Sequence, residues 1–131
     1  MRIYLCRHAE AAPGEPDNDR ELTPTGVEQA RDLGESLAAT TDPPALVLTS
    51  PLLRARQTAA EIGRATGAAV QIDDALAPGA TAESLVAAVV GAHGPVAAVG
   101  HQPDCSEIAY AILGRDPGFP VAAMHVLEVE G

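Results

Sequence analysis

The chain of 131 residues contains no lysine and no tryptophan, and only 2% of it is aromatic. Because hydrophobic residues still make up 47% of the sequence, a core must be built from aliphatic side chains and alanine. All eight permanently charged cations are arginines, and 18 acidic residues bring the net charge to −10. This charge argues against a nucleic-acid partner, since the phosphate backbone selects basic surfaces.

Other absences narrow the class of protein further. No apolar run approaches the ~18 residues of a membrane-spanning helix, and the N-terminus lacks the basic and apolar regions of a signal peptide. Two cysteines, Cys6 and Cys105, do not make a disulfide framework. We therefore expect a cytoplasmic protein with no membrane partner. The sequence does not indicate an oligomeric state.

Motifs of metal and nucleotide chemistry are missing as well. There is no H-E-x-x-H zinc motif and no G-x-x-x-x-G-K-[ST] phosphate loop. Neither cysteine is followed six positions later by the arginine of a cysteine-phosphatase loop, because positions 12 and 111 are alanines. We therefore expect no metal and no cofactor.

Strand-like and helix-like runs alternate along the chain. Short apolar runs predict strands over 2–7, 45–50, 68–73, 96–101 and 122–130. Helices are predicted over about 24–40, 52–65, 82–92 and 103–113, with capping residues at Thr23, Ser50 and Thr81.

This alternation predicts one α/β domain over residues 1–131. We expect a three-layer sandwich with a mostly parallel sheet of about five strands and an antiparallel edge strand. Gly34 lies on the apolar face of the first helix, where it would allow a neighbouring helix to pack closely.

Polar side chains stand where three of the predicted strands end. Arg7 and His8 close the first strand, Arg54 follows the second in the first turn of a helix, and His101 ends the fourth. Because the carboxyl ends of parallel strands meet at one edge of a sheet, we expect these four side chains to converge.

Such a cluster suits phosphoryl transfer. Two guanidinium groups and a helix N-terminus form an anion site. A neutral imidazole can attack phosphorus, and a second histidine can donate hydrogen bonds to the nonbridging oxygens. Water would then hydrolyse the phosphohistidine, and arginines with a protonated imidazole would replace the charge of a metal.

The motifs that carry these residues resemble those of a known family. They are "RHAEA" at 7–11, "LTPTG" at 22–26, "TSPLLRARQTA" at 49–59 and "VGHQP" at 99–103. Together they resemble the histidine phosphatase superfamily, with its phosphoglycerate-mutase-like fold. The short chain and "RELTPTG" at 20–26 are most similar to the small bacterial phosphohistidine phosphatases. One departure is Ala9, which stands where the family signature has glycine.

The resemblance implies roles for the clustered residues. His8 would be the nucleophile, Arg7 and Arg54 would bind the phosphoryl group, and His101 would be the second histidine of the pocket. Arg20 matches an arginine of the small phosphatases and is expected to contact the substrate from outside the cluster, although a surface role is nearly as well supported.

A general acid is not evident. Many relatives carry a glutamate after the third strand. Here Asp74 and Glu83 lie in that segment, neither at a convincing position, and Glu10 is another candidate. A sugar alkoxide is a poor leaving group that needs an acid, whereas a phosphorylated imidazole is already activated. The favoured substrate is therefore phosphohistidine in a protein.

Two other functions stay open at this stage. One is a small-molecule phosphomonoesterase with the same chemistry, and the other is a module that binds a phosphorylated ligand without turnover. The remaining polar residues have simpler interpretations. Cys6, His93 and His125 are expected to be structural, Arg56 to be solvated, and Cys105 to pack in the core rather than line the rim of the pocket.

Overall fold

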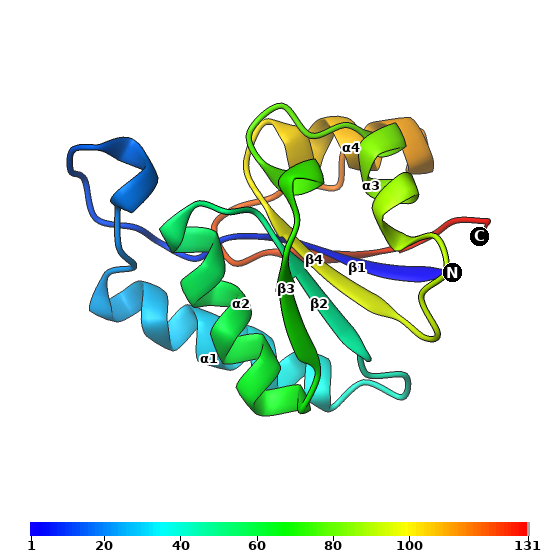
Figure 1. Cartoon of the computed structure of the whole chain (residues 1–131), viewed down its shortest axis with the longest axis horizontal. Coiled ribbons are helices and arrows are strands. Elements are labelled where there is room, and N and C mark those ends of the chain that lie inside the picture. Colours follow the sequence, from blue (N-terminus) through cyan, green and yellow to red (C-terminus); the bar gives the residue numbers. More distant parts are fainter. Residues whose placement is uncertain (131) are drawn as a thin grey trace.

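A computed structural model describes residues 1–130 as a sheet covered by helices on both faces (Figure 1). Strands β1 to β4 run parallel to one another, and β5 runs antiparallel to β1 at one edge, in the order β3-β2-β4-β1-β5. The strands span Arg2–Arg7 (β1), Leu46–Thr49 (β2), Ala69–Ile72 (β3), Val96–Gly100 (β4) and Met124–Glu128 (β5). The predicted fold class is confirmed.

Two pairs of helices complete the three layers. Helices α1 and α2 cover one face of the sheet, and α3 and α4 cover the other (Figure 1). The helices span Pro24–Ala38 (α1), Leu53–Thr66 (α2), Ala82–Val89 (α3) and Asp104–Leu113 (α4). Two short 3₁₀ turns that the sequence did not predict are η1 (Asp17–Asp19) and η2 (Asp74–Leu76).

The helix starts are partly as predicted. Thr23 and Thr81 cap α1 and α3, since each hydroxyl accepts a hydrogen bond from a backbone amide of the first turn. Helix α2 begins at Leu53, within one residue of the prediction, but the predicted cap is wrong: the residue before the helix is Leu52, and the Ser50 hydroxyl accepts from the amide of Leu52 and contacts a histidine rather than accepting from an amide of the first turn. Helix α3 ends at Val89, short of the predicted 92, because the backbone of Val90 is no longer helical.

The core has two parts because alternate residues of a strand face opposite sides of the sheet. Ile3 and Leu5 of β1 pack on the α3–α4 side, whereas Tyr4 and Cys6 pack on the α1–α2 side. Both clusters are mainly aliphatic, as the composition predicts. The structural assignment of Cys6 is confirmed, since its side chain is fully buried. The interior strand β1 is thereby packed from both faces of the sheet.

Two glycines let α1 approach its neighbours closely. A Cβ placed on Gly34 would lie 2.8 Å from the carbonyl oxygen of Glu61 on α2, so the predicted close packing is confirmed. A Cβ on Gly26 would collide with the backbone carbonyl of Glu10. Helix α1 therefore packs tightly against α2 and against the segment that follows β1, where the polar cluster begins.

Candidate active site

The sheet brings the predicted residues to one edge. Strands β1 and β4 are neighbours, with Arg7 level with Gly100. The next amide along, that of His8, donates to the carbonyl oxygen of Gly100 at 3.1 Å. The ring centroids of His8 and His101 are therefore only 5.2 Å apart, with their planes tilted by 54°. Strand β2 pairs with the other side of β4 and leads into α2, which carries Arg54 in its first turn.

His8 has a defined protonation pattern. Its Nδ1 lies 2.7 Å from the carbonyl oxygen of Ala9. A carbonyl oxygen can only accept, so Nδ1 carries the proton and Nε2 keeps its lone pair. Burial lowers the pKa of His8, and the positive charges of Arg54 and Arg7 lower it further, against the opposing effect of the Ala9 carbonyl. At neutral pH the ring is therefore neutral, with a nucleophilic nitrogen available.

Helix α2 holds the peptide that orients this ring. The amide of Ala9 donates to the hydroxyl of Thr58 at 3.0 Å, and that hydroxyl donates to the carbonyl oxygen of Arg54 at 2.9 Å. Sequence reasoning did not identify Thr58 as a functional residue. The available signal was its place one helical turn after Arg54 in the motif at 49–59.

The two arginines of the cluster have hydrogen-bond donors that the protein pairs only in part. Nη1 of Arg7 donates to the carbonyl oxygen of Phe119 at 3.0 Å, and Nη1 of Arg54 donates to that of Asp17 at 2.9 Å. The Nε of each arginine is buried without a hydrogen-bond partner among residues 1–130. Buried donors are normally paired. Two cations with spare donors at one sheet edge therefore suit an anionic ligand.

A carboxylate that the sequence did not single out joins Arg54 to Arg20. Asp17, in η1, accepts from Nη2 of Arg54 at 3.3 Å and from Nη1 of Arg20 at 3.1 Å. The hydrogen bond from Arg20 and the charge of Arg54 lower the pKa of Asp17. The structure thus brings Arg20 to the border of the cluster, through Asp17. A direct contact of Arg20 with substrate stays a prediction.

His101 is the most deeply buried titratable group of the cluster, with 4% of its surface exposed. Its Nε2 lies 2.7 Å from the hydroxyl of Ser50, and its Nδ1 has no partner within the described part of the chain. Burial, and next the charge of His8, lower the pKa of His101 to about 4. Burial and the neighbouring cations therefore both favour the neutral ring of His101.

None of the three carboxylates considered as a general acid joins this cluster. Glu10 accepts from the hydroxyl of Thr23 at 2.8 Å and so belongs to the start of α1. Asp74 lies in η2, and Glu83 lies in the first turn of α3. Across residues 1–130, no hydrogen bond or ion pair links the three to the two histidines or their arginines. A general acid is therefore not identified.

Residues predicted to be structural lie around the site. Cys105 packs in the core, with 1% of its surface exposed, and burial raises the pKa of its thiol to about 12. Its interpretation as a packing residue is confirmed. Nε2 of His125 lies 2.8 Å from the carbonyl oxygen of Gly118, and its ring packs edge-on against Phe119. His125 therefore supports the segment whose carbonyl accepts from Arg7.

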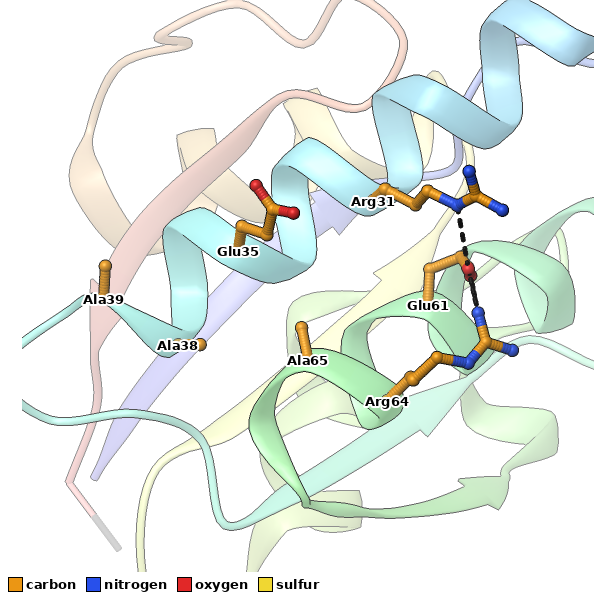
Figure 2. Close-up of a pocket in the computed structure, with 7 residues that line it drawn as sticks. All are labelled: Arg31, Glu35, Ala38, Ala39, Glu61, Arg64 and Ala65. Atoms are coloured by element: carbon orange, nitrogen blue, oxygen red, sulfur yellow. Dashed lines mark hydrogen bonds and ion pairs between the residues drawn. The ribbon is translucent and has the colours of Figure 1, made fainter.

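A wide groove lies elsewhere, between α1 and α2, with a volume of about 670 Å³ (Figure 2). Arg31 of α1 and Arg64 of α2 both pair with the buried carboxylate of Glu61, as the dashed lines in Figure 2 show. The groove contains none of the predicted site residues. Its lining consists of Arg31, Glu35, Ala38, Ala39, Glu61, Arg64 and Ala65.

The described residues contain neither a metal-binding cluster nor a membrane-spanning helix. Within 1–130, no group of three histidine, cysteine, aspartate or glutamate side chains is arranged to hold a metal ion. None of the helices in the same range is both long enough and apolar enough to cross a membrane.

Comparisons with known proteins agree with the geometry. The sequence profile of the histidine phosphatase superfamily (branch 1) matches residues 3–78. An uncharacterised protein of Picosynechococcus sp. is 35% identical over 90% of this chain and 76% of its own length. The Agrobacterium tumefaciens protein assigned as a phosphohistidine phosphatase SixA is 32% identical, with a TM-score of 0.82 over 96% of this chain and 89% of its own.

Two further solved structures share the fold. The protein histidine phosphatase SixA, complexed with tungstate, is 26% identical, with a TM-score of 0.86 over 99% of this chain and 89% of its own. A mycobacterial glucosyl-3-phosphoglycerate phosphatase is 22% identical, with a TM-score of 0.76 over 95% of this chain and 88% of its own. At that identity the second likeness concerns the fold alone.

Proposed function

This chain belongs to the histidine phosphatase superfamily, and we propose that it hydrolyses phosphohistidine in proteins through a phosphoryl group carried on His8. The phosphatase class follows from the family. The observation that supports the mechanism is the state of His8, whose Nε2 is unprotonated beside two buried arginines with spare donors. An imidazole lone pair next to an anion site is the arrangement that nucleophilic attack on phosphorus requires.

The first step forms one bond and breaks one. Nε2 of His8 attacks phosphorus, and the bond from phosphorus to the leaving group breaks as the new P–N bond forms. Arg7 and Arg54 hold the nonbridging oxygens, where the charge of the transition state accumulates. The ring of His8 becomes cationic in this step, and the carbonyl oxygen of Ala9, 2.7 Å from Nδ1, stabilises that charge.

The second step restores the enzyme. A water molecule attacks phosphorus, the P–N bond breaks, and its electron pair returns to Nε2 of His8. The proton of the water leaves with inorganic phosphate or passes to solvent. Nδ1 keeps its proton throughout, because the Ala9 carbonyl continues to accept from it.

The choice of a protein-borne phosphohistidine rests on the leaving group. When the substrate is a phosphoimidazole that is protonated on its other nitrogen, breaking the P–N bond releases a neutral imidazole. This leaving group needs no proton from an acid. An alkoxide leaving group requires a proton, and no carboxylate of the described residues is joined to His8 or His101. The likeness to SixA phosphatases, at 26% and 32% identity, also supports this substrate.

We propose a cytoplasmic location and a single domain over 1–131.

Trapping the covalent intermediate tests the mechanism. The protein is mixed with a phosphorylated histidine-phosphotransfer domain, quenched in alkali to preserve phosphohistidine, and digested for mass spectrometry. We expect one added phosphoryl group on the peptide containing His8, and no turnover by His8→Ala. The control is His93→Ala, which removes a histidine outside the cluster and should leave turnover intact. Full activity of His8→Ala would refute the proposal.

A substrate panel tests the substrate class separately. The same phosphotransfer domain is compared with sugar monophosphates and an aryl phosphate, and kcat/KM is measured for each. We expect a preference for the phosphorylated protein. A higher kcat/KM for a sugar phosphate would assign the chain to small-molecule hydrolysis while leaving the role of His8 intact. Binding of vanadate with no turnover of any substrate would indicate a binding module.

A further inference from the structure

Ser50 occupies a position that phosphoryl binding alone does not explain. It follows β2, is fully buried, and places its hydroxyl 2.7 Å from Nε2 of His101. The same hydroxyl accepts a hydrogen bond from the amide of Leu52 at 3.2 Å. A buried hydroxyl with two polar neighbours has few ways to arrange its proton, so the direction of its bond to His101 can be argued.

Two arrangements are possible for a neutral ring, which has one N–H. If Nε2 of His101 carried the proton and donated to Ser50, the hydroxyl proton would have no acceptor in residues 1–130, and Nδ1 would be a buried acceptor without a donor. If Ser50 donates to Nε2, its oxygen still accepts from Leu52, so both capacities of the hydroxyl are used and the Nδ1 N–H is the one group of the pair left without a partner in residues 1–130. Each buried polar group left unpaired destabilises the fold, and the second arrangement leaves one such group where the first leaves two, so the second is favoured.

We propose that Ser50 is a positioning residue, which fixes the His101 tautomer with the proton on Nδ1 and thereby makes a neutral ring a hydrogen-bond donor to the phosphoryl group. The direction of the serine bond stands on the geometry of the protein itself. The identity of the acceptor, a phosphoryl oxygen, rests on the proposed function.

A neutral donor suits this pocket better than a cationic one. The ring of His8 lies 5.2 Å away and gains a positive charge when it takes the phosphoryl group. Arg7 and Arg54 already supply two fixed positive charges at the same edge. A second imidazolium would add repulsion just as His8 becomes charged, whereas a neutral N–H donates without that cost. Orienting groups of this kind fix which ring nitrogen carries the proton.

The test is nitrogen NMR of the full-length protein with ¹⁵N-labelled histidine, at about neutral pH, where the ring is neutral. We expect Nδ1 of His101 to resonate as a protonated ring nitrogen and Nε2 as an unprotonated one. In Ser50→Ala this pattern should be lost or reversed. Partners that orient metal-bound histidines typically contribute about 10–100-fold, and by analogy kcat of Ser50→Ala should fall by about that factor while KM changes little.

Thr49 offers a matched control. It is fully buried, precedes Ser50 in the chain, and its hydroxyl donates to the backbone carbonyl of Ser50 at 3.0 Å, with no hydrogen bond to His101 among residues 1–130. Thr49→Val removes this hydroxyl and should leave the ring pattern and kcat unchanged. Ser50→Thr keeps the hydroxyl and should restore the protonated Nδ1.

Each outcome decides the matter. A protonated Nε2 in the wild-type spectrum overturns the proposal even if the variants do not fold, and so does an unchanged ring in folded Ser50→Ala. The spectrum is recorded without substrate, so it does not depend on the proposed function. If the ring behaves as expected but no phosphoryl group is trapped on His8, the proposed function fails alone.

Discussion

Arginines gather in two regions of this acidic protein, and the two regions differ in how their charge is compensated. In the groove between α1 and α2, Arg31 and Arg64 flank one buried carboxylate, and their side chains are 63% and 70% exposed (Figure 2). At the sheet edge, the Arg54 side chain is 9% exposed. There Arg7 and Arg54 donate partly to backbone carbonyls and keep a buried Nε free of partners among residues 1–130.

The volume of a cavity and its capacity to bind an anion are different properties in this protein. The groove is wide, but Glu61 already receives both of its arginines, so little charge is left for a ligand. At the sheet edge the donors outnumber the acceptors that the protein supplies. Unpaired buried donors therefore distinguish the candidate active site better than cavity volume does.

The largest expected effect contrasts one arginine from each region, both on α2. Arg54→Met and Arg64→Met each remove a guanidinium group and keep an apolar stem. Removing a group that stabilises transition-state charge typically costs about 10²–10³ in rate, so we expect kcat/KM of Arg54→Met to fall by that factor. Arg64→Met should stay within about twofold of wild type because Arg64 lies in the groove, outside the cluster, with an exposed guanidinium group. Equal losses in the two variants would remove the distinction between the regions.

The second prediction concerns pH, to which only the sheet edge should respond through histidine. The pKa of His101 is lowered from 6.5 to about 4, so the unfolded chain binds a proton in that interval before the folded protein does. Stability therefore falls as pH decreases from 6.5 towards 4. Compared with His101→Gln, wild type should lose about 2–3 kcal/mol more of its unfolding free energy between about pH 7 and pH 4.5.

Urea titrations of both proteins at the two pH values measure this difference. The lowered pKa of His8 acts in the same direction and is common to both proteins. Parallel losses in the two proteins would show that His101 does not resist protonation in the folded state.

The third prediction disturbs the groove and leaves the sheet edge alone. Gly34→Ala places a methyl group 2.8 Å from the carbonyl oxygen of Glu61 and 3.1 Å from Cβ of Ala65. Overpacking of this kind costs about 1–3 kcal/mol, which a shift of the urea midpoint would measure. Specific activity of the folded fraction should not change. A matching loss of kcat/KM would show that the α1–α2 contact is coupled to the site.

The smallest expected effect lies at the border of the site. Asp17 is a carboxylate that occupies donors of Arg54 and Arg20, so an incoming anion must compete with it. Asp17→Asn should bind vanadate about twofold to fivefold more tightly, consistent with the modest energy of an exposed ion pair. Asp19→Asn, at the other end of η1, is the control and should leave the vanadate inhibition constant unchanged. Weaker binding by Asp17→Asn would mean that Asp17 helps to hold the arginines in place.

The sequence predicts the convergence of the cluster because it depends on topology. Strands β1, β4 and β2 are parallel, with β4 between the other two, so their carboxyl ends lie at one edge of the sheet. His8, Arg54 and His101 follow these ends and must therefore approach one another. Strand alternation predicts the two-sided core for the same reason. Both features follow from the order of the strands and helices along the chain and from the spacing of its apolar residues, which can be read from a single sequence.

The supporting contacts could not be predicted in the same way. Thr58 donates along its helix and accepts from Ala9, and Ser50 meets His101 instead of capping α2. Asp17 reaches Arg54 only because the loop after β1 folds back over the site through η1. Each contact depends on loop conformation and side-chain rotamer, which leave no periodic signal in the residues.

The order β3-β2-β4-β1-β5 has a consequence for synthesis on the ribosome. The first three strands to emerge include β1 and β2, which do not touch, because β4 lies between them. A nascent chain that ends before Val96 carries His8, Arg7 and Arg54 but has no continuous sheet to align them. The cluster can assemble only after β4 has inserted between β1 and β2, so synthesis must proceed past this strand before the four side chains meet.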